Sequence, residues 1–117
     1  MYHKYNMDAE QEYMILMKLK QNNVWYKLKC QRYSGNDQYH NVFDIGYNEN
    51  NTFGEIEFSK IPTWRVFWYD NGIVHRDSGY LLTNFEKLIR RIMKNCLPGI
   101  KKKIMDERKA EIEKDFI

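Results

Sequence analysis

The sequence predicts an α+β fold: an antiparallel β-meander of four to five strands, preceded by an N-terminal helix and followed by two C-terminal helices. A nearly continuous apolar run falls within residues 9–20, alternating apolar and polar residues fill residues 24–76, and an apolar stripe at helical spacing begins after residue 84. A meander of this kind buries one face beneath helices. No repeat and no Pro/Gly/Ser-rich linker divides the chain, so we expect one α+β domain over residues 1–117, the length of one ordinary domain.

Residues 9–20 are expected to form the N-terminal helix. Asp8 is a good N-cap, and Glu10 and Glu12 place negative charge in the first turn, where the helix dipole favours it. The following apolar residues are Tyr13, Met14, Ile15, Leu16, Met17 and Leu19. A helix with so broad an apolar surface is expected to pack on a sheet.

The β-meander is predicted over residues 24–76 from alternation with a period of two. In its first strand one face holds Val24, Tyr26, Leu28 and Cys30, and the other holds Trp25, Lys27, Lys29 and Gln31. A turn in residues 34–38 leads to a strand with Phe43, Ile45 and Tyr47 on one side. The third strand places Ile56 and Phe58 inward and Glu55 and Glu57 in solvent, and Pro62 ends it.

Residues 63–76, TWRVFWYDNGIVHR, predict a tight hairpin. The Asn71-Gly72 pair favours a type I′ turn, which needs positive φ at both central residues. This turn sets four cross-strand pairs: Asp70 with Ile73, Tyr69 with Val74, Trp68 with His75, and Phe67 with Arg76. One face then holds Trp64, Val66, Trp68, Ile73 and His75, and the other holds Arg65, Phe67, Tyr69, Val74 and Arg76. Trp64, Val66 and Trp68 make the better core.

Two helices are predicted over residues 84–115. Thr83 and Glu86 fit a capping box at the start of the first, whose apolar stripe is Phe85, Leu88, Ile89, Ile92, Met93 and Cys96. Leu97, Pro98 and Gly99 are expected to end it. The last helix, residues 101–114, has a thin apolar stripe that includes Phe116 at its end, and Lys103–Glu107 and Lys109–Glu113 are spaced as ion pairs for a solvated helix.

The charge is uneven along the chain. The formal net charge is +3, with −1 in residues 1–60 and +4 in residues 61–117, and residues 84–103 carry Glu86 as their one acidic residue. A basic segment of this kind favours an acidic partner, either nucleic acid or an acidic protein face. No apolar run approaches the ~20 residues of a membrane span, and the start lacks the apolar core of a signal peptide. We therefore expect a cytoplasmic protein with no membrane partner, whose Cys30 and Cys96 are free thiols.

No catalytic, nucleotide-binding or metal-binding motif is present. The histidines, His3, His40 and His75, are scattered, and His75 is expected to pack opposite Trp68. Glu55 and Glu57 share a strand face, but two outward glutamates on an amphipathic strand are usually solvated rather than catalytic. The sequence therefore favours a protein that is not an enzyme and uses no cofactor and no metal.

Two groups of residues are candidates for binding. The first is the face with Arg65, Phe67, Tyr69 and Arg76, where arginines alternate with aromatic rings suited to stacking bases or anchoring an interface. The alternative is that Phe67 and Arg76 form a structural cation–π pair and that a helix covers this face. The second group comprises the basic residues of the C-terminal segment: Lys87, Arg90, Arg91, Lys94, Lys101, Lys102 and Lys103.

The composition carries one loose resemblance. Lysine outnumbers arginine by 13 to 6, and asparagine, isoleucine and tyrosine are abundant. A compact α+β chain of this bias, with no active-site motif, resembles the small accessory proteins of phages and mobile elements, including anti-CRISPR and other anti-defence inhibitors. That resemblance implies a stoichiometric inhibitor of a host protein or nucleoprotein complex, acting as a monomer or homodimer. The alternative is a small nucleic-acid-binding module that uses the same residues to stack bases and hold phosphates.

Overall fold

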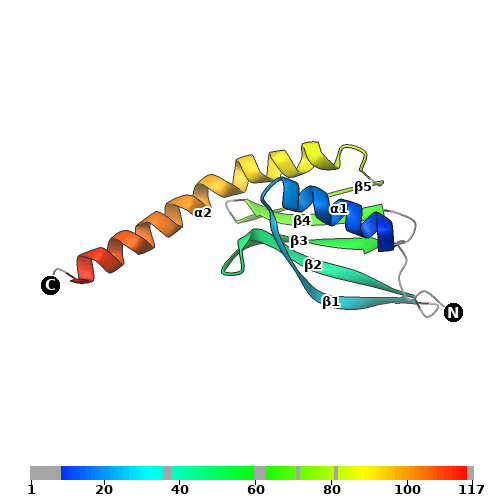
Figure 1. Ribbon diagram of the computed structural model, residues 1–117, viewed down its shortest axis with the longest axis horizontal. Coiled ribbons are helices and arrows are strands. Elements are labelled where there is room, and N and C mark those ends of the chain that lie inside the picture. The colour runs from blue at the N-terminus through cyan, green and yellow to red at the C-terminus, as the bar shows by residue number, and fades with distance from the viewer. Residues whose placement is uncertain (1–8, 36–37, 60–62, 71, 81, 116–117) are drawn as a thin grey trace.

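The computed structural model describes residues 9–35, 38–59, 63–70, 72–80 and 82–115. Helix α1 spans Ala9–Gln21, and the strands are β1 (Trp25–Gly35), β2 (Gln38–Asn48), β3 (Asn51–Ser59), β4 (Thr63–Asp70) and β5 (Ile73–Tyr80). Helix α2 spans Phe85–Asp115 (Figure 1). The strands form one antiparallel sheet in the order β1-β2-β3-β4-β5, which confirms the predicted meander. The predicted roles of Asp8, Pro62, Asn71 and Phe116 lie outside the described residues.

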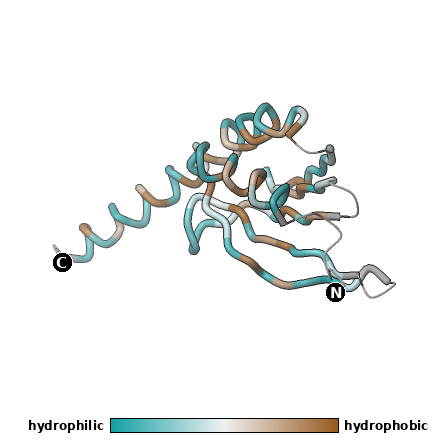
Figure 2. Tube along the Cα trace, turned by 45° about the vertical axis from the view of Figure 1, so that its right-hand side comes forward, coloured by the Kyte–Doolittle hydropathy of each residue, from teal (hydrophilic) through white to brown (hydrophobic). Residues whose placement is uncertain are grey.

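The C-terminal segment differs from the prediction, because it is one helix and not two. Helix α2 has 31 residues and continues through Pro98 and Gly99. Proline removes one backbone hydrogen bond and crowds the carbonyl four residues earlier, here that of Lys94. Both Pro98 and Lys94 are exposed, so water can solvate that carbonyl, and good helix formers flank the segment, with Met93 and Lys94 before it and Lys101, Lys102 and Lys103 after it. The distal part of α2 extends beyond the sheet and is largely hydrophilic (Figures 1 and 2).

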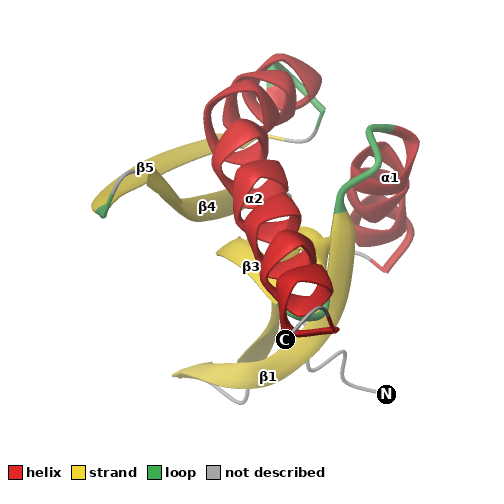
Figure 3. Ribbon diagram, turned by 90° about the vertical axis from the view of Figure 1, so that its left-hand side faces the viewer, coloured by secondary structure: helices red, strands yellow, loops and turns green. Residues whose placement is uncertain are grey.

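The helices pack against one face of the sheet, and the core lies between the two layers (Figure 3). Ile15 and Leu19 of α1 and Phe85, Ile89 and Ile92 of α2 are fully or almost fully buried there. The sheet contributes Phe43, Ile45, Ile56, Phe58, Trp64, Val66 and Trp68. Trp64 is 2% exposed and meets Phe85 edge-on with ring centroids 5.0 Å apart, so the predicted core tryptophans are confirmed. All buried apolar residues of α2 in the described chain lie between Phe85 and Cys96.

An asparagine with positive φ lies next to each helix, after the end of α1 and before the start of α2. Asn23, at φ 60°, follows α1, and the amide of Val24 donates to the carbonyl of Leu19 at 2.9 Å. This closure resembles a Schellman motif, with the side chains of Val24 and Leu19 buried together. Before α2, Asn84 has φ 58° and its carbonyl accepts from the amide of Leu88.

The predicted hairpin register is confirmed. Asp70 pairs with Ile73, Tyr69 with Val74, Trp68 with His75 and Phe67 with Arg76. Gly72 has φ 78°, the left-handed region that the turn requires. His75 stacks on Trp68 with ring centroids 5.4 Å apart, as expected for that pair. Strand β5 continues to Tyr80, beyond the predicted end of the meander at residue 76.

Candidate functional site

The sheet face that the helices leave uncovered, here called the open face, carries the first predicted binding group. Register places Arg65, Phe67 and Tyr69 of β4 on it, next to Val74 and Arg76 of β5. Tyr69 is 57% exposed and Val74 is 48% exposed. The guanidinium carbon of Arg76 lies 5.3 Å from the centre of the Phe67 ring. The cation–π pair considered in the sequence is therefore present, but no helix in the described structure covers it.

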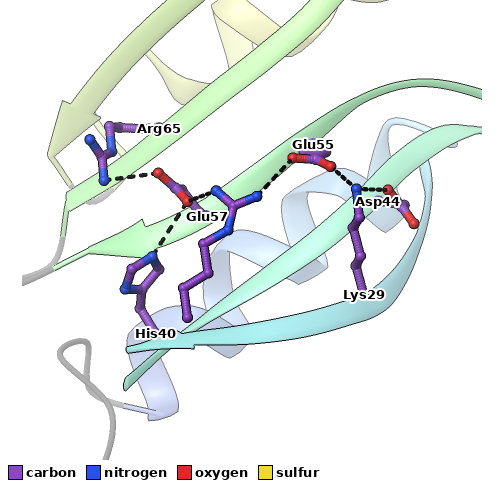
Figure 4. A network of polar contacts seen from close by, with 7 residues as sticks. Lys29, His40, Asp44, Glu55, Glu57 and Arg65 are labelled. Carbon is purple, nitrogen blue, oxygen red and sulfur yellow. Dashed lines mark hydrogen bonds and ion pairs between the residues drawn. The ribbon is translucent and has the colours of Figure 1, made fainter. Parts of the chain in front are cut away.

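Charged side chains cross the open face from β1 to β4 (Figure 4). Glu57 accepts from Arg32 at 2.9 Å and pairs with Arg65 at 2.8 Å. Arg32 also lies 3.7 Å from Glu55, and Glu55 accepts a hydrogen bond from Lys29. Lys29 in turn lies 4.0 Å from Asp44. The three carboxylates of this row therefore neutralise its three cations, Lys29, Arg32 and Arg65.

A β-bulge explains how β1 reaches this row. Leu28 pairs with Phe43 and Cys30 pairs with Val42, so Lys29 is the extra residue. A bulge shifts the alternation by one residue. Leu28 and Cys30, which were predicted to share a face, are therefore separated, and Leu28 is half-exposed. The bulge also brings Lys29 and Arg32 to the carboxylates of β3. The hydrogen bond that Lys29 donates to Glu55 is the main cause of a raised pKa for the Lys29 ammonium.

Glu57 contradicts the sequence prediction that both glutamates of β3 are solvated. Glu57 is only 3% exposed, because Val42 lies opposite it on β2 and the side chains of Arg32 and Arg65 cover it. Sequence alternation could place Glu57 on the open face but could not show that arginines from two other strands meet there. Arg65 is consequently a structural partner of Glu57 and not a free cation.

His40 is the second buried polar group beside this row. It is 7% exposed, and its Nε2 lies 3.4 Å from a Glu57 carboxylate oxygen. Neither ring nitrogen has a hydrogen-bond partner within the described structure. No group of three or more His, Cys, Asp or Glu side chains in that part of the chain is arranged to hold a metal ion.

The cysteines are free, as expected. Cys96 is buried, and its thiol donates to the carbonyl of Tyr69 at 3.3 Å. Burial, with a smaller contribution from Asp70, raises the pKa of this thiol to about 11. The thiolate is therefore scarce at neutral pH, and Cys96 is a core residue rather than a nucleophile.

The second predicted binding group lies on α2, in the helical layer on the other side of the sheet. Arg90 pairs with Glu86 at 2.8 Å, while Arg91 pairs with Asp77 at 3.5 Å and lies over the Trp68 ring. Glu86 also faces Lys18 of α1, at 3.6 Å. Lys87, Lys94, Lys101, Lys102 and Lys103 are exposed. The sheet therefore separates the two predicted groups, which do not form one surface.

An exposed apolar patch lies at the β4–β5 hairpin and goes beyond the residues selected from the sequence. The hairpin patch, as used below, consists of Phe67, Tyr69, Val74 and Arg76 on the open face. Ile73, predicted to share the core face, is 62% exposed beside the turn, on the edge strand β5. The signal for Val74 was already in the sequence, since the predicted register places it directly opposite Tyr69.

Neither helix of the described chain combines the length and the hydrophobicity that a membrane span requires. No protein-family model matches the sequence, and neither curated proteins nor solved structures show significant similarity to it. The candidate sites therefore rest on this chain's own geometry.

Proposed function

We propose that this chain is a non-enzymatic binding protein that docks on a larger host protein or nucleoprotein complex through the hairpin patch and blocks it stoichiometrically. The observation that carries the proposal is the exposure of Tyr69 and Val74 next to the Phe67–Arg76 pair, at the end of an otherwise charge-neutralised face. Aromatic and arginine side chains are the most frequent anchors of protein interfaces.

The charges of the open face favour a protein partner for this patch over nucleic acid. A phosphate clamp needs cations that are not already neutralised. Arg65 and Arg32 are held by Glu57, and Lys29 is held by Glu55 and Asp44. Arg76 is the exposed cation that the hairpin patch itself supplies, with its guanidinium over an aromatic ring. A mixed apolar and cationic patch fits a protein surface that offers an apolar pocket beside a carboxylate.

The proposal assigns no catalytic role to the buried carboxylate. Glu57 lies between two guanidinium groups and is shielded from solvent, so it has no route to a substrate in this arrangement. A role in holding β1, β3 and β4 together accounts for its contacts. An inhibitor that acts by occupying a surface needs only a rigid sheet beneath its anchors.

The test is capture of a partner by the immobilised chain, followed by titration of the purified pair. Tyr69→Ala with Arg76→Glu is expected to weaken the binding at least about 100-fold, since central interface anchors contribute ~2 kcal/mol or more each. Arg65 is left intact because its replacement would leave Glu57 buried without one of its cations. The matched control is Tyr13→Ala, which removes a similarly exposed tyrosine from α1.

Binding with a one-to-one endpoint that the double variant loses and the control keeps would support the proposal. Full binding by a folded double variant would refute the hairpin patch as the docking surface. Turnover of a captured partner, seen as a covalent change in its mass, would contradict the non-enzymatic function.

A further inference from the structure

The continuity of α2 places basic residues from both of its predicted halves on one face. Successive residues of an α-helix are rotated by about 100°, so residues three, four, seven and eleven apart recur on the same side. On that geometry the basic stripe consists of Lys87, Arg90, Arg91, Lys94, Lys101, Lys102, Arg108 and Lys109. All of these side chains are exposed. Lys103, although adjacent to Lys102, is directed to the opposite side of the helix together with Lys114.

The basic stripe keeps most of its charge free. Within α2, Glu86, Asp106, Glu107, Glu111 and Glu113 all fall outside the sector that the stripe occupies. Two members have carboxylate partners, Arg90 with Glu86 and Arg91 with Asp77 of β5. The remaining members make no ion pair within 4.0 Å in the described residues. The predicted Lys109–Glu113 pair is likewise not formed there, so Lys109 stays available to an external anion.

The stripe is long and its distal part is accessible from all sides. From Lys87 to Lys109 it extends for about 33 Å at the rise of an α-helix. Ile100 still packs against the core, and the distal part of the helix beyond it extends away from the sheet and from α1 (Figures 1 and 3). The molecule measures 63 Å along its longest axis and 26 Å and 25 Å across the other two. An extended polyanion can therefore contact the whole stripe without colliding with the sheet.

The residue types in the basic stripe favour a nucleic-acid duplex over a single strand or a membrane surface as the bound polyanion. Single strands are usually held by stacking on aromatic rings, but the one aromatic residue in the described α2, Phe85, is buried. A membrane-surface helix needs an apolar face opposite its charges. In the distal part, the large exposed apolar residues are Met105 and Ile112, and both lie within the stripe itself. A duplex carries one phosphate charge per ~1.7 Å of axis, and its major groove is wide enough to admit an α-helix.

We propose that the basic stripe of α2 binds the phosphate backbone of double-stranded nucleic acid, largely without regard to sequence. The contacts are ion pairs from lysine and arginine side chains to phosphate groups. The projecting distal half of α2 lies along or within the major groove. This site is separate from the hairpin patch. A nucleoprotein partner could therefore be held at two places, its protein by the hairpin patch and its nucleic acid by the stripe.

The experiment is an anisotropy titration of the full chain with a fluorescent DNA duplex of about 20 base pairs, at two salt concentrations. Binding is expected to weaken steeply as salt rises, because phosphate contacts release counterions. Lys101→Glu with Lys109→Glu reverses two charges of the stripe in the solvent-exposed half of α2. We expect this variant to lose at least about tenfold in affinity and to reduce the salt slope by about two.

The matched control is Lys103→Glu with Lys114→Glu, which changes the net charge equally on the opposite side of the same helix. It is expected to bind within about threefold of the unmodified chain. Equal losses in both variants would show attraction by net charge alone and would overturn the stripe. Absence of duplex binding at low salt would also overturn the proposal. Displacement of the duplex by a modest amount of polyglutamate would overturn it as well, because that result would indicate an acidic protein as the partner of the stripe.

Two further measurements serve as controls. Circular dichroism checks that both charge variants remain helical, as expected because their substituted residues make no core contact. The hairpin variant Tyr69→Ala with Arg76→Glu is expected to bind the duplex as the unmodified chain does. Loss of duplex binding in that variant would show that the two surfaces are not separate and would overturn the assignment to α2.

Discussion

The environment of Glu57 in the sheet gives this side chain a structural role that its position on the strand does not reveal. On an isolated amphipathic strand a glutamate opposite the core is solvated, which is how the alternation describes it. In the sheet, Arg32 from β1 and Arg65 from β4 approach it from both sides at 2.9 Å and 2.8 Å. Removing either arginine would leave this buried carboxylate with one guanidinium partner instead of two, which is destabilising. Glu57 therefore belongs to the architecture of the open face, on which the hairpin patch depends.

Glu12 makes a residue-scale prediction about pH. It accepts from Asn41 at 2.9 Å at the boundary between α1 and the sheet, and burial there raises the pKa of its carboxyl above the ordinary value, although the hydrogen bond opposes the shift. The folded state therefore disfavours the ionised form at neutral pH. This cost begins to decrease as the pH falls through the folded-state pKa and disappears below the lower pKa of the unfolded state. Glu12→Gln keeps an acceptor for Asn41. We expect it to be more stable than the unmodified chain at pH 7, with the difference closing on acidification.

Chemical denaturation across the acidic range measures this difference. Glu10→Gln is the control, because it removes the same charge from the same first turn at an exposed position. That control is expected to be slightly destabilising at neutral pH through loss of a favourable interaction with the helix dipole. A Glu12→Gln variant that behaves like the control at every pH would contradict the dominance of burial at Glu12.

Helix α2 consists of two physically different halves. The first half is fixed by core residues from Phe85 to Cys96, whereas the second half is exposed along most of its length. Pro98 lies at the junction, where one backbone hydrogen bond is missing. The helix is therefore most easily interrupted where its support from the core ends.

Pro98→Ala is expected to strengthen the distal half locally. Restoring the hydrogen bond and relieving the ring contact is worth up to ~3 kcal/mol, so amide hydrogen exchange beyond residue 98 should slow by up to about 100-fold. The thermal midpoint of the core should change little, since no fully buried residue of the described α2 lies past the proline. A large rise in that midpoint would contradict the independence of the two halves.

At the scale of the whole molecule, the projecting helix sets the shape. The radius of gyration is 16.8 Å, against about 13 Å for a compact chain of this length. Small-angle X-ray scattering of the monomer is expected to give a value near 16.8 Å. Truncation after Ile100 should reduce it toward the compact value while the core stays folded. A full-length value near 13 Å would mean that the distal half folds back, which would hide the basic stripe.

Much of the fold could be predicted from local patterns. Alternation indicated a meander of four to five strands, although β5 continues past its predicted end, and the Asn71-Gly72 turn set the hairpin register; Trp64, Val66 and Trp68 were assigned to the core for their size. The errors came from positions where local rules compete. Lys29 enters a bulge that alternation does not anticipate, and Leu97-Pro98-Gly99 has the appearance of a helix end although neighbouring residues sustain the helix.

The sequence by itself determined the α+β class, the register of the hairpin and the core positions of Trp64, Val66 and Trp68, because these depend on turn chemistry and on the periods of strand and helix. Only the tertiary structure decided which sheet face stays open, that Arg65 is bound to a buried glutamate, and that basic residues on both sides of Pro98 share one helix face. Each of these depends on the meeting of residues far apart in the chain, or on a balance of small energies at one proline. Local patterns do not contain that information.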